Sequence, residues 1–296
     1  MAEGVLLVDV DSTIPNLALM HLSTFYKDQG ETVGFNVPDP RLIYASCVFD
    51  WNRHKTDGLK FLYPNATIDI GGSGVSLTKS LGLSIDLLKP DYSLYPACDY
   101  DLGFTSRGCI RKCPFCVVPI KEGSFRINQH PREFHEPSHK KAVYMDNNIL
   151  ANPDWFNEVA DYTISNKIKV DFDQGLDLRL ITPEIAEKIA ECKTFKPWRF
   201  AFDNLALKDQ VLRAFHLLDR AGVRLRWNAE CYVYCNGADQ LDSAIERCNI
   251  LRSIGVMPYP MYDRHAEITP RMRDLKKWCR PWIFYSIPFN EFKRGV

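Results

Sequence analysis

Short apolar runs alternate with amphipathic stretches along most of this chain. Residues 4–9 form a continuous apolar run that ends in an acid, which is typical of a strand buried in a parallel sheet. Residues 15–29 follow with apolar positions at helical spacing, and Gly30 supplies a stop signal. Three more strand-like runs come next, at residues 32–35, 42–49 and 67–70. This alternation predicts a small doubly wound, Rossmann-like α/β domain in residues 1–98.

A second and longer series of strand–helix units begins at residue 99. Six strands are expected, at residues 102–105, 142–145, 168–172, 199–202, 224–233 and 256–262. Helices are expected between them, at residues 153–164, after the Thr182-Pro183-Glu184 start signal, and at residues 211–221 and 241–253. The series predicts an α/β fold in which residues 99–265 form a partial (β/α)6 TIM-like barrel. Residues 266–296 are rich in aromatic residues and are expected to form a C-terminal cap.

Charge and composition narrow the class of protein. The 37 basic residues balance the 37 acidic ones, which argues against broad nucleic-acid binding by bulk electrostatics but leaves a local basic patch open. The first residues lack a basic signal-peptide region, and no apolar stretch approaches the ~20 residues that span a bilayer. Ten cysteines without an export signal are expected to be ligands or core thiols. We therefore expect a cytoplasmic protein with no membrane partner.

The most specific chemical signal lies in residues 103–119. Cys109, Cys113 and Cys116 stand at C-x3-C-x2-C spacing, so three thiolates on one loop can converge on one inorganic centre. A structural zinc site needs four ligands and a [4Fe–4S] cluster usually has four cysteines, so three ligands leave one metal position open for chemistry. Spacing alone leaves two alternatives. The three cysteines could be ordinary thiols, or they could bind a structural zinc ion together with a fourth ligand from Cys98, His130 or His135.

This cysteine order resembles the cluster loop of the radical S-adenosylmethionine (SAM) superfamily. Phe115, the apolar residue before the last cysteine, also fits that pattern, and the resemblance covers roughly residues 100–265. It implies a [4Fe–4S] cluster on Cys109, Cys113 and Cys116, with SAM on the open iron and Phe115 beside the cofactors. The implied reaction is reductive cleavage of SAM to a 5′-deoxyadenosyl radical, which abstracts hydrogen from an unidentified substrate. A reducing partner such as flavodoxin or ferredoxin is implied as well.

The resemblance also implies SAM ligands just beyond the strand ends. Asp146, Asn147 and Asn148 would bind the amino group, unless they only cap a helix. Arg179 would pair with the carboxylate, unless it forms a surface salt bridge. Asp203 or Asn204, at the end of the fourth strand, would bind the ribose hydroxyls of SAM. Tyr259, on the sixth strand, would pack against the adenine.

Residues 1–98 resemble the cobalamin-binding-type domain that precedes many radical SAM barrels. Asp11 stands in place of the cobalt-ligating histidine and Ile14 in place of a glycine, whereas Gly71 and Gly72 are kept. We expect a remnant domain that binds no cobalamin. Two alternatives stay open, a cobalamin-dependent radical SAM methyltransferase and a non-catalytic zinc or iron–sulfur binding module. Methylthiotransfer to tRNA is disfavoured, since that family has three N-terminal cluster cysteines and this segment has only Cys47 and Cys98.

The remaining cysteines and histidines are expected to be structural. Cys231 and Cys235 lie on a predicted strand, where their Cα atoms would be ~13 Å apart, too far for one metal. Together with Cys248 and Cys279 they are predicted to be core thiols. His130, His135 and His139 lie in a proline-broken segment that predicts a solvated loop.

Overall fold

The computed structural model describes residues 4–292 and divides the chain into two compact units. The first comprises Met1–Arg111 and Cys116–Lys140, and the second comprises Lys112–Phe115 and Lys141–Val296. The division into domains predicted from the sequence, with boundaries after residues 98 and 265, stays a prediction. No helix in residues 4–292 combines the length and the apolar character that crossing a membrane requires.

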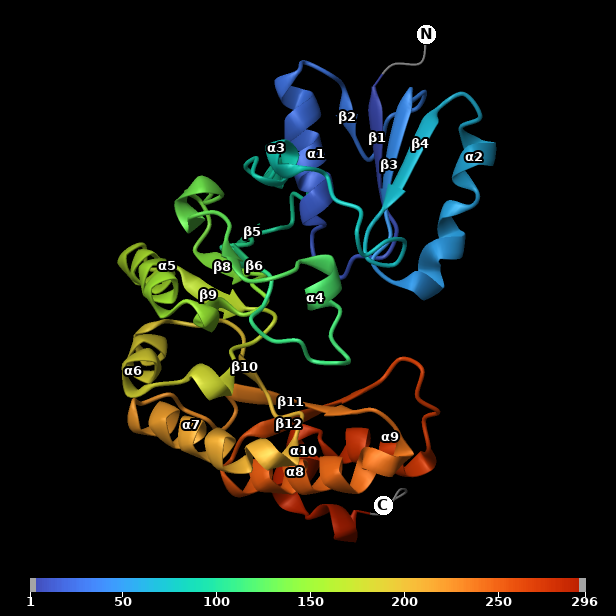
Figure 1. Ribbon diagram of the computed structural model, residues 1–296. Coiled ribbons are helices and arrows are strands. Elements are labelled where there is room, and N and C mark those ends of the chain that lie inside the picture. Colours follow the sequence, from blue (N-terminus) through green and yellow to red (C-terminus); the bar gives the residue numbers. More distant parts are fainter. Residues whose placement is uncertain (1–3, 293–296) are drawn as a thin grey trace. The chain divides into compact units, whose positions relative to one another are not determined.

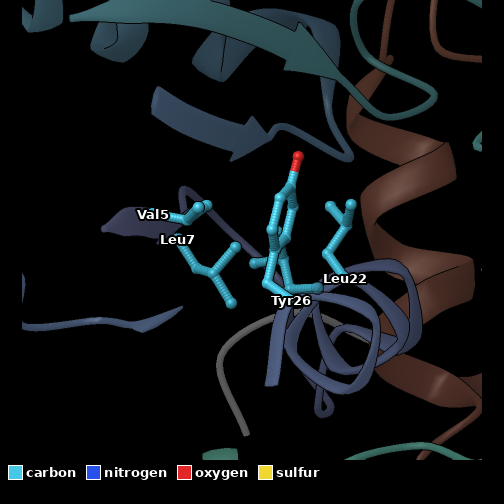
Figure 2. Close-up of a cluster of buried hydrophobic side chains, with 5 residues drawn as sticks. Val5, Leu7, Leu22 and Tyr26 are labelled. Atoms are coloured by element: carbon cyan, nitrogen blue, oxygen red, sulfur yellow. The ribbon is translucent and has the colours of Figure 1, made fainter. Parts of the chain in front are cut away.

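A four-stranded parallel sheet organises the first unit, in the order β2-β1-β3-β4. Its strands are β1 (Val5–Asp9), β2 (Val33–Gly34), β3 (Leu42–Ser46) and β4 (Thr67–Gly71). Helix α1 (Leu17–Asp28) packs Leu22 and Tyr26 against Val5 and Leu7 of β1 (Figure 2). The short helices α2 (Leu59–Leu62) and α3 (Leu83–Asp86) complete the layer. The α/β class predicted for this segment is confirmed.

Helix α1 begins two residues later than its sequence pattern suggests. The Asn16 side chain accepts a hydrogen bond from the Leu19 N–H at 3.2 Å and so caps the helix, leaving Pro15 outside it. At the other end Gly30 has φ +76°, the left-handed conformation expected of a C-terminal stop.

The rest of the first unit carries two of the three loop cysteines. Strand β5 (Asp101–Gly103) is followed by β6 (Ser106–Arg107), which pairs antiparallel with β7 (Arg126–Ile127). This two-stranded stem closes the base of the cysteine loop, in which α4 (Val118–Lys121) is a single turn. The strand predicted over residues 102–105 ends early because the chain turns to form this stem.

The second unit contains five parallel strands in chain order. They are β8 (Lys141–Tyr144), β9 (Lys169–Phe172), β10 (Trp198–Ala201), β11 (Ala229–Cys235) and β12 (Met257–Tyr262). Continuous ladders join β8 to β9 and β10 through β12. Between these ladders lie two isolated parallel bridges, Val170–Thr194 and Leu176–Phe200. Parallel α/β structure is therefore confirmed, whereas the TIM-like barrel stays a prediction.

Helices of the second unit alternate with these strands, as predicted. They are α5 (Pro153–Ser165), α6 (Pro183–Glu191), α7 (Lys208–Arg220), α8 (Leu241–Ser253), α9 (Pro270–Trp278) and α10 (Pro281–Ser286). Figure 1 shows α7 and α8 on one side of β10–β12. The strand face of Phe200, Cys231 and Val233 is fully buried, while the face of Arg199, Tyr232 and Tyr259 is more open. The sheet therefore has a buried apolar face and a second face that carries polar and aromatic groups.

Candidate functional site

A polar network lies beyond the carboxyl ends of β8 and β9. Asn148 is buried and its Nδ2 donates to Asp177 Oδ2 at 3.4 Å. Asp177 in turn accepts from Arg179 Nε at 2.6 Å and Nη2 at 2.9 Å, a bidentate pair. Asp146 is also buried, at 3% exposure. The structure thus brings together Asn148 and Arg179, two of the SAM ligands implied by sequence, and adds Asp177 between them.

The helix-cap alternative for these residues is not borne out for Asn148. Its side chain makes no capping hydrogen bond, and α5 is capped instead by Asn152, whose Oδ1 accepts from the Trp155 N–H at 3.1 Å. Arg179 does form a salt bridge, with Asp177, and its own side chain is 30% exposed, so the salt-bridge alternative stays open for this residue.

Asp203 extends the network beyond β10. Its Oδ1 accepts the Tyr234 N–H at 3.0 Å. Burial raises the pKa of this carboxyl, and the Tyr234 N–H and the positive charges of Arg247 and Arg179 act in the opposite direction. Asn204 is different, since its Oδ1 accepts the Ala206 N–H at 2.9 Å and caps a short turn. Of the two ribose candidates, Asp203 is therefore the one that lies with the network.

Arg247 of α8 is a member of this region that sequence reasoning missed. It is only 1% exposed and donates to the carbonyl oxygens of Phe202 at 2.7 Å and Tyr234 at 2.9 Å. These bonds tie the ends of β10 and β11 to the helix beneath them. A signal was present, because Arg247 interrupts the otherwise apolar face of α8.

The open face of the sheet carries a second group of polar side chains. Arg199 of β10 forms an ion pair with Asp171 of β9 and lies 3.6 Å from Asp173. Burial raises the pKa of Asp171, and the positive charge of Arg199 opposes that rise. Burial also raises the pKa of Tyr232 to about 12, so its phenol is neutral. Tyr259, the implied adenine contact, faces Tyr232 with ring centroids 5.6 Å apart, in the middle of β12 rather than beyond its end.

The cysteine loop has a tightly closed base. Gly108 has φ +76°, and a Cβ atom there would lie 2.2 Å from the Ser124 carbonyl oxygen, so only glycine fits. The Cys109 N–H donates to the Gly123 carbonyl at 3.2 Å. The Arg111 N–H donates to Cys109 Sγ at 3.3 Å, an amide–sulfur contact of the kind found at metal-bound thiolates.

The three loop thiols differ from most other cysteines of the chain in their exposure. All of them are partly exposed, whereas six of the other seven cysteines are buried. Cys109 and Cys116 belong to the first unit and Cys113 to the second. Within residues 4–292 no group of three or more His, Cys, Asp or Glu side chains is arranged to hold a metal ion. The fit to a cluster therefore rests on the donor set and on the amide–sulfur contact at Cys109.

Phe115 occupies a defined place in the second unit. Its ring stacks on Tyr234 of β11, and the Tyr234 hydroxyl donates to Asp263 at 2.7 Å. The implied role of Phe115 beside the cofactors stays a prediction, but the segment that carries it lies against a strand of the polar network.

The candidate fourth zinc ligands have other structural roles. The Cys98 thiol donates to the Tyr100 carbonyl at 3.2 Å, and His130 Nδ1 accepts the Arg132 N–H at 3.1 Å in a helical cap. His135 Nδ1 lies 2.6 Å from Asp101 Oδ2. A carboxylate on Nδ1 is also the usual arrangement of a histidine that binds zinc through Nε2, so structural zinc stays an open alternative for the loop.

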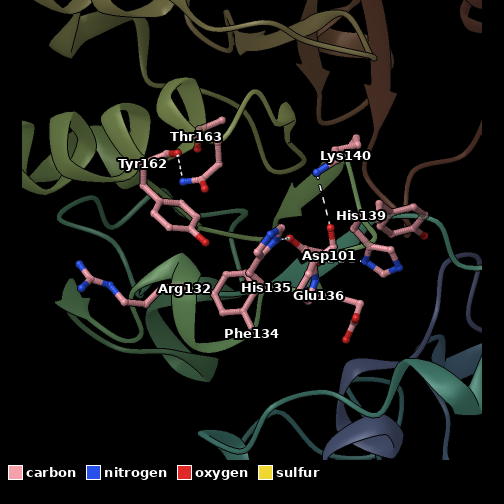
Figure 3. Close-up of polar contacts among 12 residues, drawn as sticks. Asp101, Arg132, Phe134, His135, Glu136, His139, Lys140, Tyr162 and Thr163 are labelled. Atoms are coloured by element: carbon pink, nitrogen blue, oxygen red, sulfur yellow. Dashed lines mark hydrogen bonds and ion pairs between the residues drawn. The ribbon is translucent and has the colours of Figure 1, made fainter.

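The prediction of a solvated histidine loop is wrong. His130 and His139 are buried, and His139 Nδ1 lies 3.0 Å from the buried Asp101, which also accepts the Glu136 N–H (Figure 3). The carboxylate of Asp101 contacts both His135 and His139, although Asp101 lies more than thirty positions earlier in the chain.

Asp11 accepts hydrogen bonds from the segment that follows β3 in its own unit. Its carboxylate accepts the Val48 N–H at 2.7 Å, the Phe49 N–H at 3.0 Å and the Asn52 side chain at 3.0 Å. Burial alone would raise the pKa of Asp11, but these hydrogen bonds lower it below its usual value. The glycine loop also packs on this segment, since a Cβ on Gly72 would lie 2.2 Å from the Cys47 carbonyl oxygen. The backbone of this glycine loop therefore approaches the Cys47 backbone closely.

The prediction of core thiols is confirmed for the remaining second-unit cysteines. Cys231, Cys235, Cys248 and Cys279 are all buried, and burial raises the pKa of Cys231 well above its usual value.

Comparison of the sequence with protein-family models and with curated proteins gives no match.

Proposed function

We propose that this protein is a radical SAM enzyme. The observation that carries the proposal is the C-x3-C-x2-C loop, whose Phe115 stacks on β11 within the unit that bears the polar strand ends. A three-cysteine loop and a polar strand edge are the two parts that such an enzyme needs, and this chain has both.

Cys109, Cys113 and Cys116 would hold the [4Fe–4S] cluster. When bound and reduced, the cluster supplies the electron that cleaves SAM and so yields the radical for hydrogen abstraction. The protein's own part is to fix the loop and exclude water. The Gly108 turn and the β6–β7 stem close the loop at its base, and the Arg111 N–H lowers the charge density on Cys109 Sγ.

The polar strand ends supply complementary groups for the two ends of an amino acid. Asp146 with the amide oxygens of Asn147 and Asn148 provides acceptors for an ammonium group. Asp177 uses Nε and Nη2 of the Arg179 guanidinium, which has five N–H donors, so a carboxylate ligand can share it. Asp203 is the acceptor proposed for ribose hydroxyls.

The finer fold belongs to the same proposal. Five parallel strands in chain order, covered by helices on one face, are what a partial TIM-like barrel would require of this unit. The open face around Arg199 and Tyr232 would then be the surface offered to the substrate. A reduced flavodoxin or ferredoxin would be the electron donor.

The test is anaerobic reconstitution of the full chain, with measured iron, sulfide and zinc and with an assay for 5′-deoxyadenosine from SAM and a reductant. We expect about four irons per chain and SAM cleavage. Substitution of Cys109, Cys113 or Cys116 by Ala should remove the iron, whereas Cys231→Ala, the matched control in the core, should keep it. One zinc per chain without iron would overturn the proposal.

A further inference from the structure

The amino ends of three strands in the second unit border a hollow of about 350 Å³. It lies at the opposite end of the strands from the polar network, since Lys169 begins β9 and Asn228 precedes β11. Its floor contains the buried residues Trp198 and Cys192. The residues that line it bring three cations to one place, Lys169, Lys193 and Arg224.

No carboxylate neutralises these cations. In the part of the chain that the structure describes, none of Lys169, Lys193 and Arg224 forms an ion pair. Two carboxylates act on Cys192, Glu191 and Asp161, and both pair with Lys188, at 3.0 Å and 2.9 Å. Three uncompensated positive charges around one concave surface favour an anion.

An exposed aromatic surface continues from the same segment. Trp227 follows Arg224 by three residues, and its ring lies 4.7 Å from Tyr285 and 6.1 Å from Trp282 of α10. The Arg226 guanidinium covers Tyr285 at 4.8 Å. Trp227 is 51% exposed and Trp282 is 82% exposed. We call these residues the aromatic platform.

The backbone at Trp227 is strained, which is unusual for a bulky side chain. Its φ is +70°, a conformation that favours glycine. Such strain is concentrated at functional positions, where the surrounding structure holds it in place. Here Tyr285 packs on Trp227 and donates its hydroxyl to the Gly255 carbonyl at 2.9 Å. The conformation fixes a large ring at the surface rather than in the core.

We propose that the hollow and the aromatic platform together bind a nucleotide unit, with its phosphate in the hollow and its base on the platform. A bare anion would bind the three cations but make no contact with the aromatic platform. An uncharged apolar ligand would contact the platform but leave the three cations without a counter-charge. Arg224 and Trp227 are three residues apart, so their Cα atoms are at most ~11 Å apart and one nucleotide chain can reach both. The nucleotide unit belongs either to a free nucleotide or to a single-stranded nucleic acid.

The test is fluorescence anisotropy of a labelled ~10-nucleotide oligouridylate with the full chain at several salt concentrations, with AMP and tripolyphosphate as competitors. The one phosphate in the hollow contributes about −0.7 to the slope of log K against log salt, and Arg224→Ala should reduce the magnitude of that slope. Trp282→Ala should weaken binding about fivefold or more, since a stacked base is lost. Trp51→Ala and Lys60→Ala, exposed positions in the first unit, are matched controls.

Competition by AMP and tripolyphosphate distinguishes a free nucleotide from a single-stranded nucleic acid, and it can also refute the proposal. Oligonucleotide binding that AMP displaces only weakly identifies a single strand, and equal affinity for AMP identifies a free nucleotide. Tripolyphosphate that competes as well as AMP would refute the base contact. Binding that Arg224→Ala and Trp282→Ala leave unchanged, or that Trp51→Ala weakens equally, would refute the site. Trp282 is unstrained and exposed, so its variant tests the platform even where Trp227→Ala fails to fold.

Discussion

Phe115 of the cysteine loop stacks on Tyr234 of β11, with ring centroids 4.1 Å apart and ring planes inclined by 19°. Tyr234 is itself held, because its N–H donates to Asp203 and its hydroxyl to Asp263. The stack therefore connects the residue before Cys116 to the same strand whose backbone positions a carboxyl of the polar network.

A double-mutant cycle measures this connection. Phe115→Ala, Tyr234→Ala and the double variant should show a coupling of about 0.5–1.5 kcal/mol in the free energy of unfolding, the usual size for an aromatic pair. Urea unfolding of each variant provides the measurement. Phe115→Ala combined with Tyr232→Ala is the control, since Tyr232 contacts Tyr259 instead. Additive effects in the first pair would contradict a stabilising stack.

The polar strand ends should determine affinity for SAM but not the iron content. Asp146→Ala and Arg179→Ala each remove a charged partner of the methionine moiety, so each should weaken SAM binding about tenfold or more. Calorimetry on reconstituted protein measures the affinity, and metal analysis of the same samples measures the iron. Arg213→Ala, an exposed position on α7, should change neither quantity. Parental SAM affinity in both site variants would show that the proposed ligands are wrong.

Local sequence patterns were sufficient for most of the fold. Helix α8 has the predicted bounds, and each strand of the second unit was located because apolar runs and stop signals agree there. The start of β11 was placed five residues too early. Residues 224–228 carry alternating apolar positions like a strand, but Trp227 adopts a positive φ that the pattern does not reveal.

The site was predictable only where its residues follow strand ends directly. Asn148, Arg179 and Asp203 were singled out because they follow strands, and their role as SAM contacts stays a prediction, whereas Asp177 and Arg247 became evident only from their hydrogen bonds. The buried histidines were missed for the same physical reason. Their partner Asp101 is distant in sequence, so nothing local distinguishes their segment from a solvated loop.

Stability of the first unit should fall in mild acid because of His21. Burial and, to a smaller extent, the positive charge of Arg107 together lower the pKa of His21 to about 4. The folded state holds His21 neutral, whereas the unfolded state binds a proton at His21 below about pH 6.5. The contribution of a neutral His21 to the free energy of unfolding is therefore fully present above that pH. It is lost progressively as the pH falls toward 4, by about 3 kcal/mol in all.

The measurement is urea unfolding of the parent and of His21→Phe between pH 4 and pH 7.5. Other buried acids titrate in this range, so the difference between the two proteins is the readout. We expect the parent to lose about 3 kcal/mol relative to the variant as the pH falls. A difference that does not change with pH would contradict a buried neutral His21.

The N-terminal domain should not bind cobalamin, because the Asp11 carboxylate is already used by Val48, Phe49 and Asn52. A carboxylate is also a harder donor than imidazole and is costly to place against an apolar corrin. Incubation with hydroxocobalamin, gel filtration and a corrin absorption spectrum of the protein peak provide the test. Stoichiometric cobalamin in that peak would favour the methyltransferase alternative instead.

The placement of Lys112–Phe115 in the second unit has a consequence for synthesis of the protein. The ribosome releases Phe115 about 120 residues before Tyr234, which at ~5–20 residues per second is a delay of about 6–24 s. Throughout that interval Phe115 of the nascent loop lacks its stacking partner. The Phe115–Tyr234 stack can therefore form only after β11 has been made, so the cysteine loop reaches its final packing late in synthesis.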